Sequence, residues 1–273
     1  MEMSDKHRWN PEDYERNSSA QEKWADALIF GLVLDGTEHI LDIGCGDGRI
    51  TAKIAARVPQ GQVLGIDSSQ DMIDFARARF PPSKNANLKF ELGDALRLDF
   101  DQEFDMVTSF ACLHWIRDHL TVLRGVRRSL RPGGKLLFQC GGRGNAGDLM
   151  SLTEHLIREG KWSRYFQGFR FPYCFYGPEE YHAWLEQAGL EEIRVELIPK
   201  EMVQQGKTGL EGWIRTTWHP VLERIPEDLK KQFLSEMADR YLELFPLEDG
   251  LAKVKMMRLQ VEAIVQSEKQ LET

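Results

Sequence analysis

Five short apolar segments, separated by stretches long enough for helices, restrict the folds open to this chain. They are His39–Ile43, Gln62–Ile66, Leu88–Leu92, Phe104–Phe110 and Lys135–Cys140. Regular alternation of short strands with helices is typical of βαβ units, whose strands form a parallel sheet. We therefore predict an α/β fold with a doubly wound, mostly parallel sheet.

Helical periodicity occupies the first two gaps. Ile50, Ile54 and Val58 recur every four residues, and Ser68–Asp71 has the pattern of a capping box before the helix that carries Met72. Both segments are predicted helices that follow strands.

A further helix is predicted ahead of the first strand. Tyr14, Gln21, Trp24 and Leu28 fall at intervals of seven, three and four, which places them on one helix face. That face is largely aromatic.

The second half of the chain contains an aromatic segment and further elements. Lys161–Tyr176 is rich in Trp, Tyr and Phe, a composition usually found in a core. We predict helices over Pro178–Gly189, Gly209–Trp218 and Glu227–Phe245, and strands over Glu191–Ile198 and Met256–Gln266. The long connection between these two strands exceeds a hairpin loop and predicts a helical cap.

The net charge, the cysteine spacing and the lack of a long apolar run argue against nucleic-acid, metal and membrane partners. The net charge of −8 disfavours a nucleic-acid substrate, because phosphate-backbone affinity comes from clustered Lys and Arg. No CxxC pair occurs, so we expect no metal site and reduced thiols at Cys45, Cys112, Cys140 and Cys174. No run of about 18 apolar residues is present, so we expect a soluble cytoplasmic protein that does not enter membranes.

The segment Leu41–Gly48, LDIGCGDG, combines a strand end with glycines that permit a tight turn and close approach of backbone to ligand. Its spacing is GxGxG, which does not primarily suit a pyrophosphate. Asp67 ends the second strand, where a carboxylate can accept hydrogen bonds from two ribose hydroxyls; a helix cap or solvated turn is the structural alternative. Asp94, in GDA, ends the third strand.

Together LDIGCGDG, GIDSS, GDA and the RPGG turn resemble the class I S-adenosylmethionine-dependent methyltransferases over roughly residues 38–140. The resemblance implies a Rossmann-like seven-stranded sheet and binding of S-adenosyl-L-methionine and its product S-adenosyl-L-homocysteine. It places the methionine moiety at the glycine loop, the ribose at Asp67, and adenine between Met72 and the Asp94–Ala95 pair. The implied cofactor-binding residues are Gly44, Cys45, Gly46, Asp67, Ser68, Met72, Asp94, Ala95 and Phe110.

A finer resemblance extends almost end to end. Trp9–Pro11, Tyr14, Gln21, Ser109–Trp115 and Arg240–Gly250 are similar to the trans-aconitate methyltransferases and, at Gln21 and Ser109–Trp115, to the insect juvenile hormone acid methyltransferases. Both groups methylate carboxylates. The resemblance therefore implies O-methylation of a small carboxylate, although it does not identify the acceptor, the pathway or the oligomeric state.

Three residues are the catalytic candidates. Gln21 would donate its amide hydrogens to the carboxylate, as the resemblance implies, or be an ordinary helix residue. Trp115 would line the pocket or be a core tryptophan. His114 would act as a donor or structural group, or as the general base that an amine or phenol acceptor needs.

We expect an N-terminal helical segment at 1–36, an S-adenosylmethionine-binding core at 37–145, and over 146–273 the rest of the sheet with an acceptor cap. The cap spans about 146–177 and 200–253, and we expect its segments Lys161–Tyr176 and Gly206–Phe245 to form a mobile lid over an apolar acceptor pocket. Alternative functions are an N- or C-methyltransferase, a carboxyl methyltransferase that acts on a carrier protein, a NAD-dependent oxidoreductase and a non-catalytic S-adenosylmethionine-binding protein. The GxGxG spacing and GDA disfavour NAD.

Overall fold

The computed structural model describes residues 19–266 and contains the predicted mostly parallel sheet. Its seven strands follow the order β3-β2-β1-β4-β5-β7-β6. The strands are β1 His39–Ile43, β2 Gln62–Asp67, β3 Leu88–Leu92, β4 Phe104–Phe110, β5 Leu130–Gly141, β6 Glu191–Gln205 and β7 Leu251–Ile264. β7 pairs antiparallel with both β5 and β6, and the remaining pairs are parallel.

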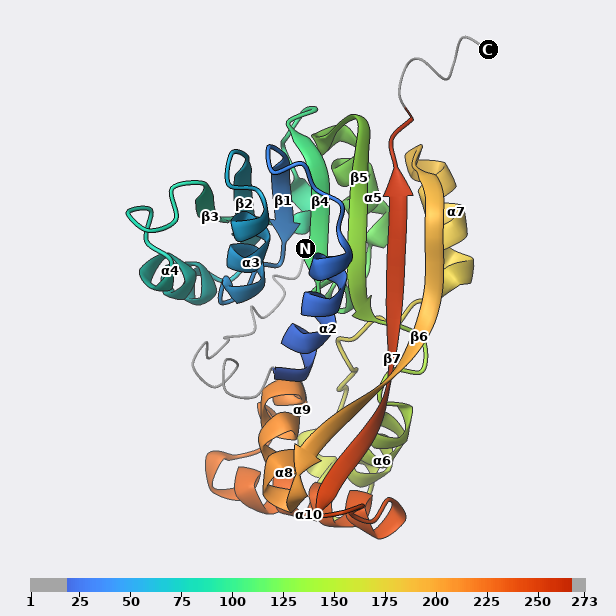
Figure 1. Cartoon of the computed structure of the whole chain (residues 1–273). Coiled ribbons are helices and arrows are strands. Elements are labelled where there is room, and N and C mark those ends of the chain that lie inside the picture. The colour runs from blue at the N-terminus through green and yellow to red at the C-terminus, as the bar shows by residue number, and fades with distance from the viewer. Residues whose placement is uncertain (1–18, 267–273) are drawn as a thin grey trace.

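Helices cover both faces of the sheet and form the cap that the sequence predicts (Figure 1). They are α2 Ser19–Gly31, α3 Arg49–Arg57, α4 Gln70–Arg79, α5 His119–Ser129, α6 Gly147–Arg158, α7 Pro178–Ala188, α8 Gly206–Thr217, α9 His219–Leu222 and α10 Glu227–Leu244. Short 3₁₀ helices lie at η1 Ala95–Arg97, η2 Leu113–Trp115 and η3 Ser163–Tyr165. No helix in residues 19–266 is long and apolar enough to cross a membrane.

The start of α4 differs by one residue from the predicted capping box. Ser69, rather than Ser68, is the N-cap: its hydroxyl accepts a hydrogen bond from Met72 N at 3.4 Å. The backbone remains extended through Ser69, so the helix starts one residue later than the sequence pattern indicates.

β6 and β7 are longer than the predicted strands Glu191–Ile198 and Met256–Gln266. They stay paired from Glu191↔Ile264 to Gln205↔Leu251, and this antiparallel ribbon leaves the sheet and enters the cap. Figure 1 shows the two strands running down between α6 and α8. The ribbon connects the two halves of the molecule through backbone hydrogen bonds.

The sheet and the cap have separate buried clusters of hydrophobic side chains, three in all among the described residues. Two of them pack on the sheet, one centred on Val107 and Phe138 and the other on Ile40 and Ile54. The third fills the cap around Trp213 and joins α6, α8 and α10 to the ribbon.

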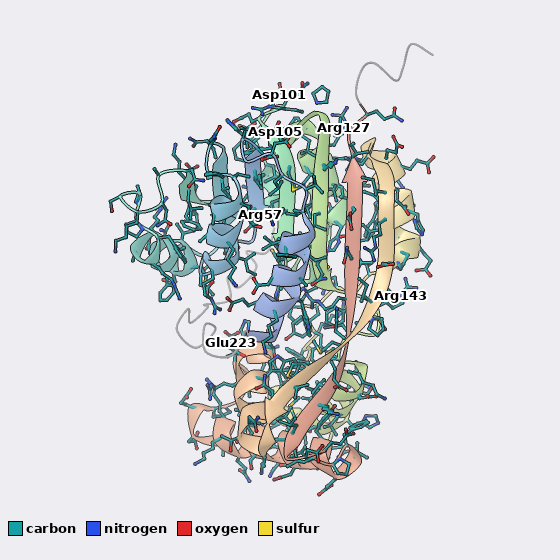
Figure 2. All side chains as sticks on the ribbon, in the orientation of Figure 1. Arg57, Asp101, Asp105, Arg127, Arg143 and Glu223 are labelled. Carbon is teal, nitrogen blue, oxygen red and sulfur yellow. The ribbon has the colours of Figure 1, made fainter. Side chains whose placement is uncertain are left out.

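Helix α2 packs against α3, on the sheet side of the molecule. Arg57 of α3 donates to the carbonyl oxygens of Ile29 (2.5 Å) and Leu32 (2.8 Å) at the end of α2 (Figure 2). Lys53 forms ion pairs with Glu22 (2.6 Å) and Asp26 (2.7 Å). These contacts hold α2 beside the turn that follows β1.

Candidate functional site

The glycine loop after β1 has a backbone that other residues would strain. Gly44 has φ +74°, and a Cβ there would lie 2.2 Å from Cys112 Sγ. Gly46 has φ +53°, and a Cβ there would enter open space. The chain runs from β1 outward to β2 and β3 on one side, and β4 and β5 lie on the other side of β1. The strand order therefore reverses next to this loop, and α/β folds bind ligands at such a switch point.

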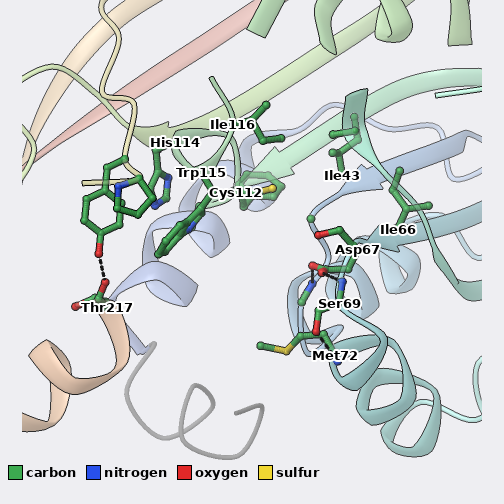
Figure 3. A pocket seen from close by; sticks show the side chains of 18 of the residues that line it. Ile43, Ile66, Asp67, Ser69, Met72, Cys112, His114, Trp115, Ile116 and Thr217 are labelled. Carbon is green, nitrogen blue, oxygen red and sulfur yellow. Dashed lines mark hydrogen bonds between the residues drawn. The ribbon is translucent and has the colours of Figure 1, made fainter. Parts of the chain in front are cut away.

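Asp67 joins two turns at this edge of the sheet. Its Oδ2 accepts from Gly46 N at 3.0 Å and its Oδ1 accepts from Ser69 N at 2.9 Å (Figure 3). Burial raises the pKa of this carboxyl, and the backbone donors act in the opposite direction. Each oxygen keeps a lone pair that could accept from a ligand hydroxyl.

Asp94 follows β3 and is the N-cap of the short helix η1. Its Oδ1 accepts from Leu96 N at 2.9 Å and caps η1, while its side chain remains exposed and the adjoining Ala95 is buried. Met72, on the first turn of α4, is also buried.

These turns open into one cavity of about 870 Å³. Apart from Cys45, all the cofactor-binding residues predicted from the sequence line it, namely Gly44, Gly46, Asp67, Ser68, Met72, Asp94, Ala95 and Phe110. Cys45 instead packs in the core beside the sheet, and its backbone N donates to Ile66 O. We call the part of the cavity lined by these eight residues the cofactor half.

The same cavity continues between η2 and the cap, and we call this part the acceptor half. Aromatic rings dominate its lining: Trp115, Tyr173, Phe175, Trp213 and Trp218. The ring centroids of Trp115 and Tyr173 are 4.9 Å apart, and those of Tyr173 and Phe175 are 5.6 Å apart. Figure 3 shows His114 and Trp115 facing Asp67, Ser69 and Met72 across the space.

His114 is half-buried and lies beside the rings of Trp115, Tyr173 and Phe175. Burial, with help from the positive charge of Arg258, lowers its pKa to about 3. Its Nδ1 accepts from Gly141 N at 3.4 Å, which places the proton of the neutral ring on Nε2. The His114 ring is therefore neutral near pH 7.

Charged side chains are segregated between the two halves. The carboxylates that line the cavity are those of Asp67 at the end of β2, Asp71 on the first turn of α4 and Asp94 after β3. The guanidinium groups, Arg117, Arg170 and Arg258, all come from beyond η2. Among residues 19–266, the acceptor half thus has cationic and neutral donors but no carboxylate in its lining.

Gln21 lies within α2, but its side chain is outside the described part of the structure. Trp24, one turn further along α2, places its ring 5.2 Å from the Arg258 guanidinium carbon. Residues three apart share a helix face, so the backbone of position 21 is on the face that meets Arg258. Tyr14 and Trp9–Pro11 lie outside the described residues.

Several lining residues were not predicted from the sequence. Asn145, Arg258 and Thr217 approach the cavity from a loop, a strand and a helix end far apart in the chain. The one local signal is Arg258 itself, which lies in β7 between the apolar residues Met257 and Leu259, since an arginine in a central strand is seldom fully buried without a specific contact.

Comparison with known proteins agrees with this geometry. Residues 40–134 match the family described as "Methyltransferase domain". An uncharacterized methyltransferase of Schizosaccharomyces pombe is 32% identical over 202 residues, which cover 70% of this chain and 74% of that protein. The trans-aconitate 2-methyltransferase of Shigella flexneri serotype 5b is 28% identical over 250 residues, with 91% and 93% covered.

Solved structures share the fold. The Haemonchus contortus phosphoethanolamine N-methyltransferase 2, in complex with phosphomonomethylethanolamine and S-adenosylhomocysteine, matches with a TM-score of 0.61 at 20% identity. The match covers 94% of this chain and 57% of that chain.

Proposed function

This chain belongs to the S-adenosylmethionine-dependent methyltransferases, and from that premise we propose that it methylates the carboxylate of a small molecule to give a methyl ester. The main support for a carboxylate acceptor is the composition of the cavity lining. Among the described residues, the acceptor half has N–H donors and arginines but no carboxylate. An anion fits that lining, whereas a protonated amine does not.

The residues of the cofactor half fit S-adenosylmethionine. Gly46 leaves open space where any other residue would place a Cβ, so the loop can lie close to a ligand. We propose that the free lone pairs of Asp67 accept from the ribose hydroxyls, and that Met72 and Ala95 bound the adenine. Gly44 and Phe110 would border the methionine end.

When bound, the cofactor supplies a methyl group on a sulfonium: an acceptor oxygen lone pair forms the new C–O bond as the C–S bond breaks and its electron pair stays on sulfur. An ionised carboxylate needs no base for this displacement. The chain's own residues therefore have to orient the acceptor and exclude water, and positioning of this kind can supply much of the rate.

We propose that neutral donors hold the reacting carboxylate. His114 contributes its Nε2–H, since Nδ1 is occupied by Gly141 N. Trp115 forms the adjoining wall, and Gln21 contributes its amide from the face of α2 that carries Trp24. The low pKa of His114 and the hydrogen bond at its Nδ1 support the donor role over a base.

A screen with isotope-labelled cofactor tests the acceptor class. Trans-aconitate, hexanoate, phenylacetate, amines and phenols should be compared, and we expect base-labile methyl esters from the acids. Their rate should persist down to a pH near 4 to 5, roughly the pKa of a carboxyl group by analogy with Asp and Glu. Methyl groups found only on nitrogen or carbon would exclude the carboxylate while leaving the methyltransferase assignment intact.

Substitution of Gln21 tests the donor set. Gln21→Ala should lower kcat/KM for the acid by roughly ten- to a hundredfold, equivalent to one or two hydrogen bonds to a charged group, with little change in cofactor affinity. Lys23→Ala, at an exposed position of the same helix, is the control and should leave kcat/KM unchanged. Full activity in Gln21→Ala would remove this residue from the site.

The environment and partners follow from the same features. We propose a small-molecule acceptor and a reducing compartment such as the cytoplasm, which suits the free thiols of Cys45, Cys112, Cys140 and Cys174.

A further inference from the structure

Asn145 is a buried amide in the turn between β5 and α6. It is 7% exposed and lines the acceptor half of the cavity. The turn follows the carboxyl end of β5, which lies at the same edge of the parallel strands as the glycine loop and Asp67. A buried amide needs a partner for each of its polar groups, because an unpaired buried donor or acceptor costs free energy.

The oxygen of the Asn145 amide completes the pairing of β5 with β7. The regular ladder between these strands ends at Gly141↔Arg258. One residue further on, Gly142 N donates to Met257 O at 2.9 Å, and Met257 N donates to Asn145 Oδ1 at 3.1 Å. The side chain thus takes the place of a backbone carbonyl, and the Met257 donor identifies Oδ1 as the amide oxygen.

The nitrogen of the same amide is left for the cavity. Nδ2 has no hydrogen-bond partner within residues 19–266. The indole nitrogens of Trp213 and Trp218 also lack a partner there but are fully enclosed, whereas Nδ2 is accessible. Because Oδ1 is held by the strand, the amide cannot rotate to hide its N–H₂ group. Asn145 therefore presents a neutral donor, and no acceptor, to the space that it lines.

The backbone around Asn145 fixes the orientation of the amide. Gly144 has φ +83°, and the next residue but one, Ala146, has φ +50° although it is not a glycine and is fully buried. A left-handed conformation at such a residue is strained and persists only where the surroundings impose it, most often at functional sites. Asn145 N donates to Gly142 O at 2.9 Å and closes the turn. The donor is thus oriented before any ligand binds.

Asn145 and His114 both border Gly141. Gly141 N donates to His114 Nδ1 at 3.4 Å. A Cβ built on this glycine would lie 3.0 Å from Asn145 Nδ2 and 2.7 Å from the Phe175 ring. The lack of a side chain at Gly141 therefore lets both polar side chains approach the same point beside an aromatic wall.

We propose that Asn145 binds the reacting carboxylate through Nδ2–H, at the oxygen that does not attack the methyl group. This inference rests on the proposed carboxyl methylation. One oxygen forms the C–O bond while the C–S bond breaks onto sulfur, and the other oxygen becomes the ester carbonyl and keeps its hydrogen bond; no proton moves.

A neutral donor suits this oxygen. The carboxylate loses its negative charge as the ester forms, so a cation in this place would stabilise the substrate more than the transition state, and an amide does so less. An amide whose oxygen is already bound also offers an ammonium group no acceptor. Asn145 therefore contributes to the selection of acids over amines.

Asn145→Asp separates the donor from the strand contact. The new side chain keeps an oxygen for Met257 N but has an acceptor in the place of Nδ2, so the acid meets a like charge. We expect kcat/KM for hexanoate and phenylacetate to fall by roughly ten- to a hundredfold. The Kd of S-adenosylhomocysteine should stay within about twofold, because Asn145 is outside the cofactor half. Undiminished efficiency in a folded Asn145→Asp protein would overturn the proposal.

The pH profile of Asn145→Asp distinguishes substrate contact from a purely structural role. As pH falls, the introduced carboxyl gains a proton and becomes an O–H donor, so efficiency relative to the unmodified protein should rise between about pH 8 and pH 5.5. Neighbouring groups stay constant in this window: the pKa of His114 is lowered to about 3, burial raises the pKa of Tyr173, and Arg258 remains charged. A reduced but constant ratio would assign Asn145 to the fold alone.

Two further variants complete the test. Gln102→Glu makes the same amide-to-acid change at an exposed position before β4, at the opposite edge of the sheet, and should leave kcat/KM unchanged. If Asn145→Asp does not fold, Asn145→Ser, which keeps a short acceptor but has no N–H₂ group, should lose about tenfold for both acids with the Kd of S-adenosylhomocysteine unchanged. Full efficiency in that variant would likewise overturn the proposal.

Calorimetry separates this inference from the proposed function. With S-adenosylhomocysteine present, hexanoate should bind the unmodified protein about tenfold or more tightly than it binds Asn145→Asp. If hexanoate binds in this way but methyl groups appear only on nitrogen or carbon, carboxyl methylation fails and Asn145 remains a carboxylate donor. If acids are methylated and Asn145→Asp binds and converts them equally well, only this inference fails.

Discussion

The two halves of the cavity are built in different ways. The cofactor half is formed by the turns after β1, β2 and β3. The Asp67 side chain accepts from the backbones of the first two turns, and Gly93 N donates to the Asp67 carbonyl oxygen. The acceptor half is formed by rings from η2, the segment around Tyr173 and α8 with the residue that follows it, and by Met256 and Arg258 of β7, which lie far apart in the sequence. One half depends on backbone conformation and the other on convergence of side chains.

This difference has consequences for sensitivity to substitution. A backbone that makes several hydrogen bonds in one conformation tolerates almost no change, whereas a wall of packed rings spreads each loss over its neighbours. We expect large, specific losses in the cofactor half and graded losses in the acceptor half.

Substitution of Gly44 should give the largest effect. Gly44→Ala forces a side chain into φ +74° and against Cys112 Sγ at 2.2 Å. Strain and overpacking together should cost about 4 kcal/mol, enough to abolish detectable S-adenosylhomocysteine binding in calorimetry. A second substitution, Cys112→Gly, removes the clash but not the strain and should restore part of the affinity. No recovery would place the whole effect in the backbone.

The same contrast explains what the sequence predicts. LDIGCGDG, Asp67 and Asp94 are recognisable because each turn is local, and a few contiguous residues specify its backbone. Arg258 and Asn145 reach the cavity only because β7 pairs with β5 and brings Met257 beside Asn145. No short-range pattern encodes that pairing. The sheet, the five parallel strands and the helical cap were predicted, whereas the length of the β6–β7 ribbon was not.

A buried acid below the glycine loop should make the cofactor half sensitive to pH. Asp42 accepts from Thr51 Oγ1 (2.7 Å) and Thr108 Oγ1 (2.9 Å), and burial raises its pKa from 3.8 to about 6. The folded state therefore binds more protons between these two values, and the free energy of unfolding falls as pH rises through that window, by about 3 kcal/mol.

Asp42→Asn should remove this dependence. Denaturant unfolding between pH 4 and 7 measures it as the difference between the variant and the unmodified protein. The difference is needed because His114, whose pKa is lowered to about 3, has the opposite slope: its contribution to stability declines as pH falls below 6.5. Parallel pH profiles for the two proteins would show that Asp42 does not titrate in this range.

Asp67→Ala should give the next largest loss and should confine it to the cofactor half. Loss of the proposed ribose hydrogen bonds should weaken S-adenosylmethionine binding by about 1.5–3 kcal/mol, the range for bonds to a charged partner. Asp74→Ala, at an exposed position of α4 outside the cavity lining, is the control for the loss of one negative charge on the next helix. An unchanged Kd in a folded Asp67→Ala protein would exclude Asp67 from ribose binding and leave it a brace between two turns.

The smallest effect should come from the contact that joins the aromatic segment to the cap. Tyr173 donates its hydroxyl hydrogen to Thr217 O at 2.5 Å, at the last turn of α8 (Figure 3). Tyr173→Phe keeps the ring stack and removes this bond, so it should lower the free energy of unfolding by about 0.5–1.5 kcal/mol. Tyr165→Phe removes a hydroxyl that contacts only neighbouring Arg164 among the described residues and is the matched control.

Hydrogen exchange decides whether this contact belongs to a moving lid. We propose that Lys161–Tyr176 and Gly206–Phe245 close over the acceptor, so S-adenosylhomocysteine should slow exchange in both segments. Tyr173→Phe should reduce that protection at the end of α8, where the Thr217 carbonyl loses its donor, while the cofactor Kd stays within about twofold because the turns after β1 and β2 are untouched. Equal exchange with and without the cofactor product would make the cap a fixed scaffold. A loss of cofactor affinity as large as that of Asp67→Ala would show that the two halves are one cooperative unit, because the bond at Thr217 contacts none of the residues that line the cofactor half.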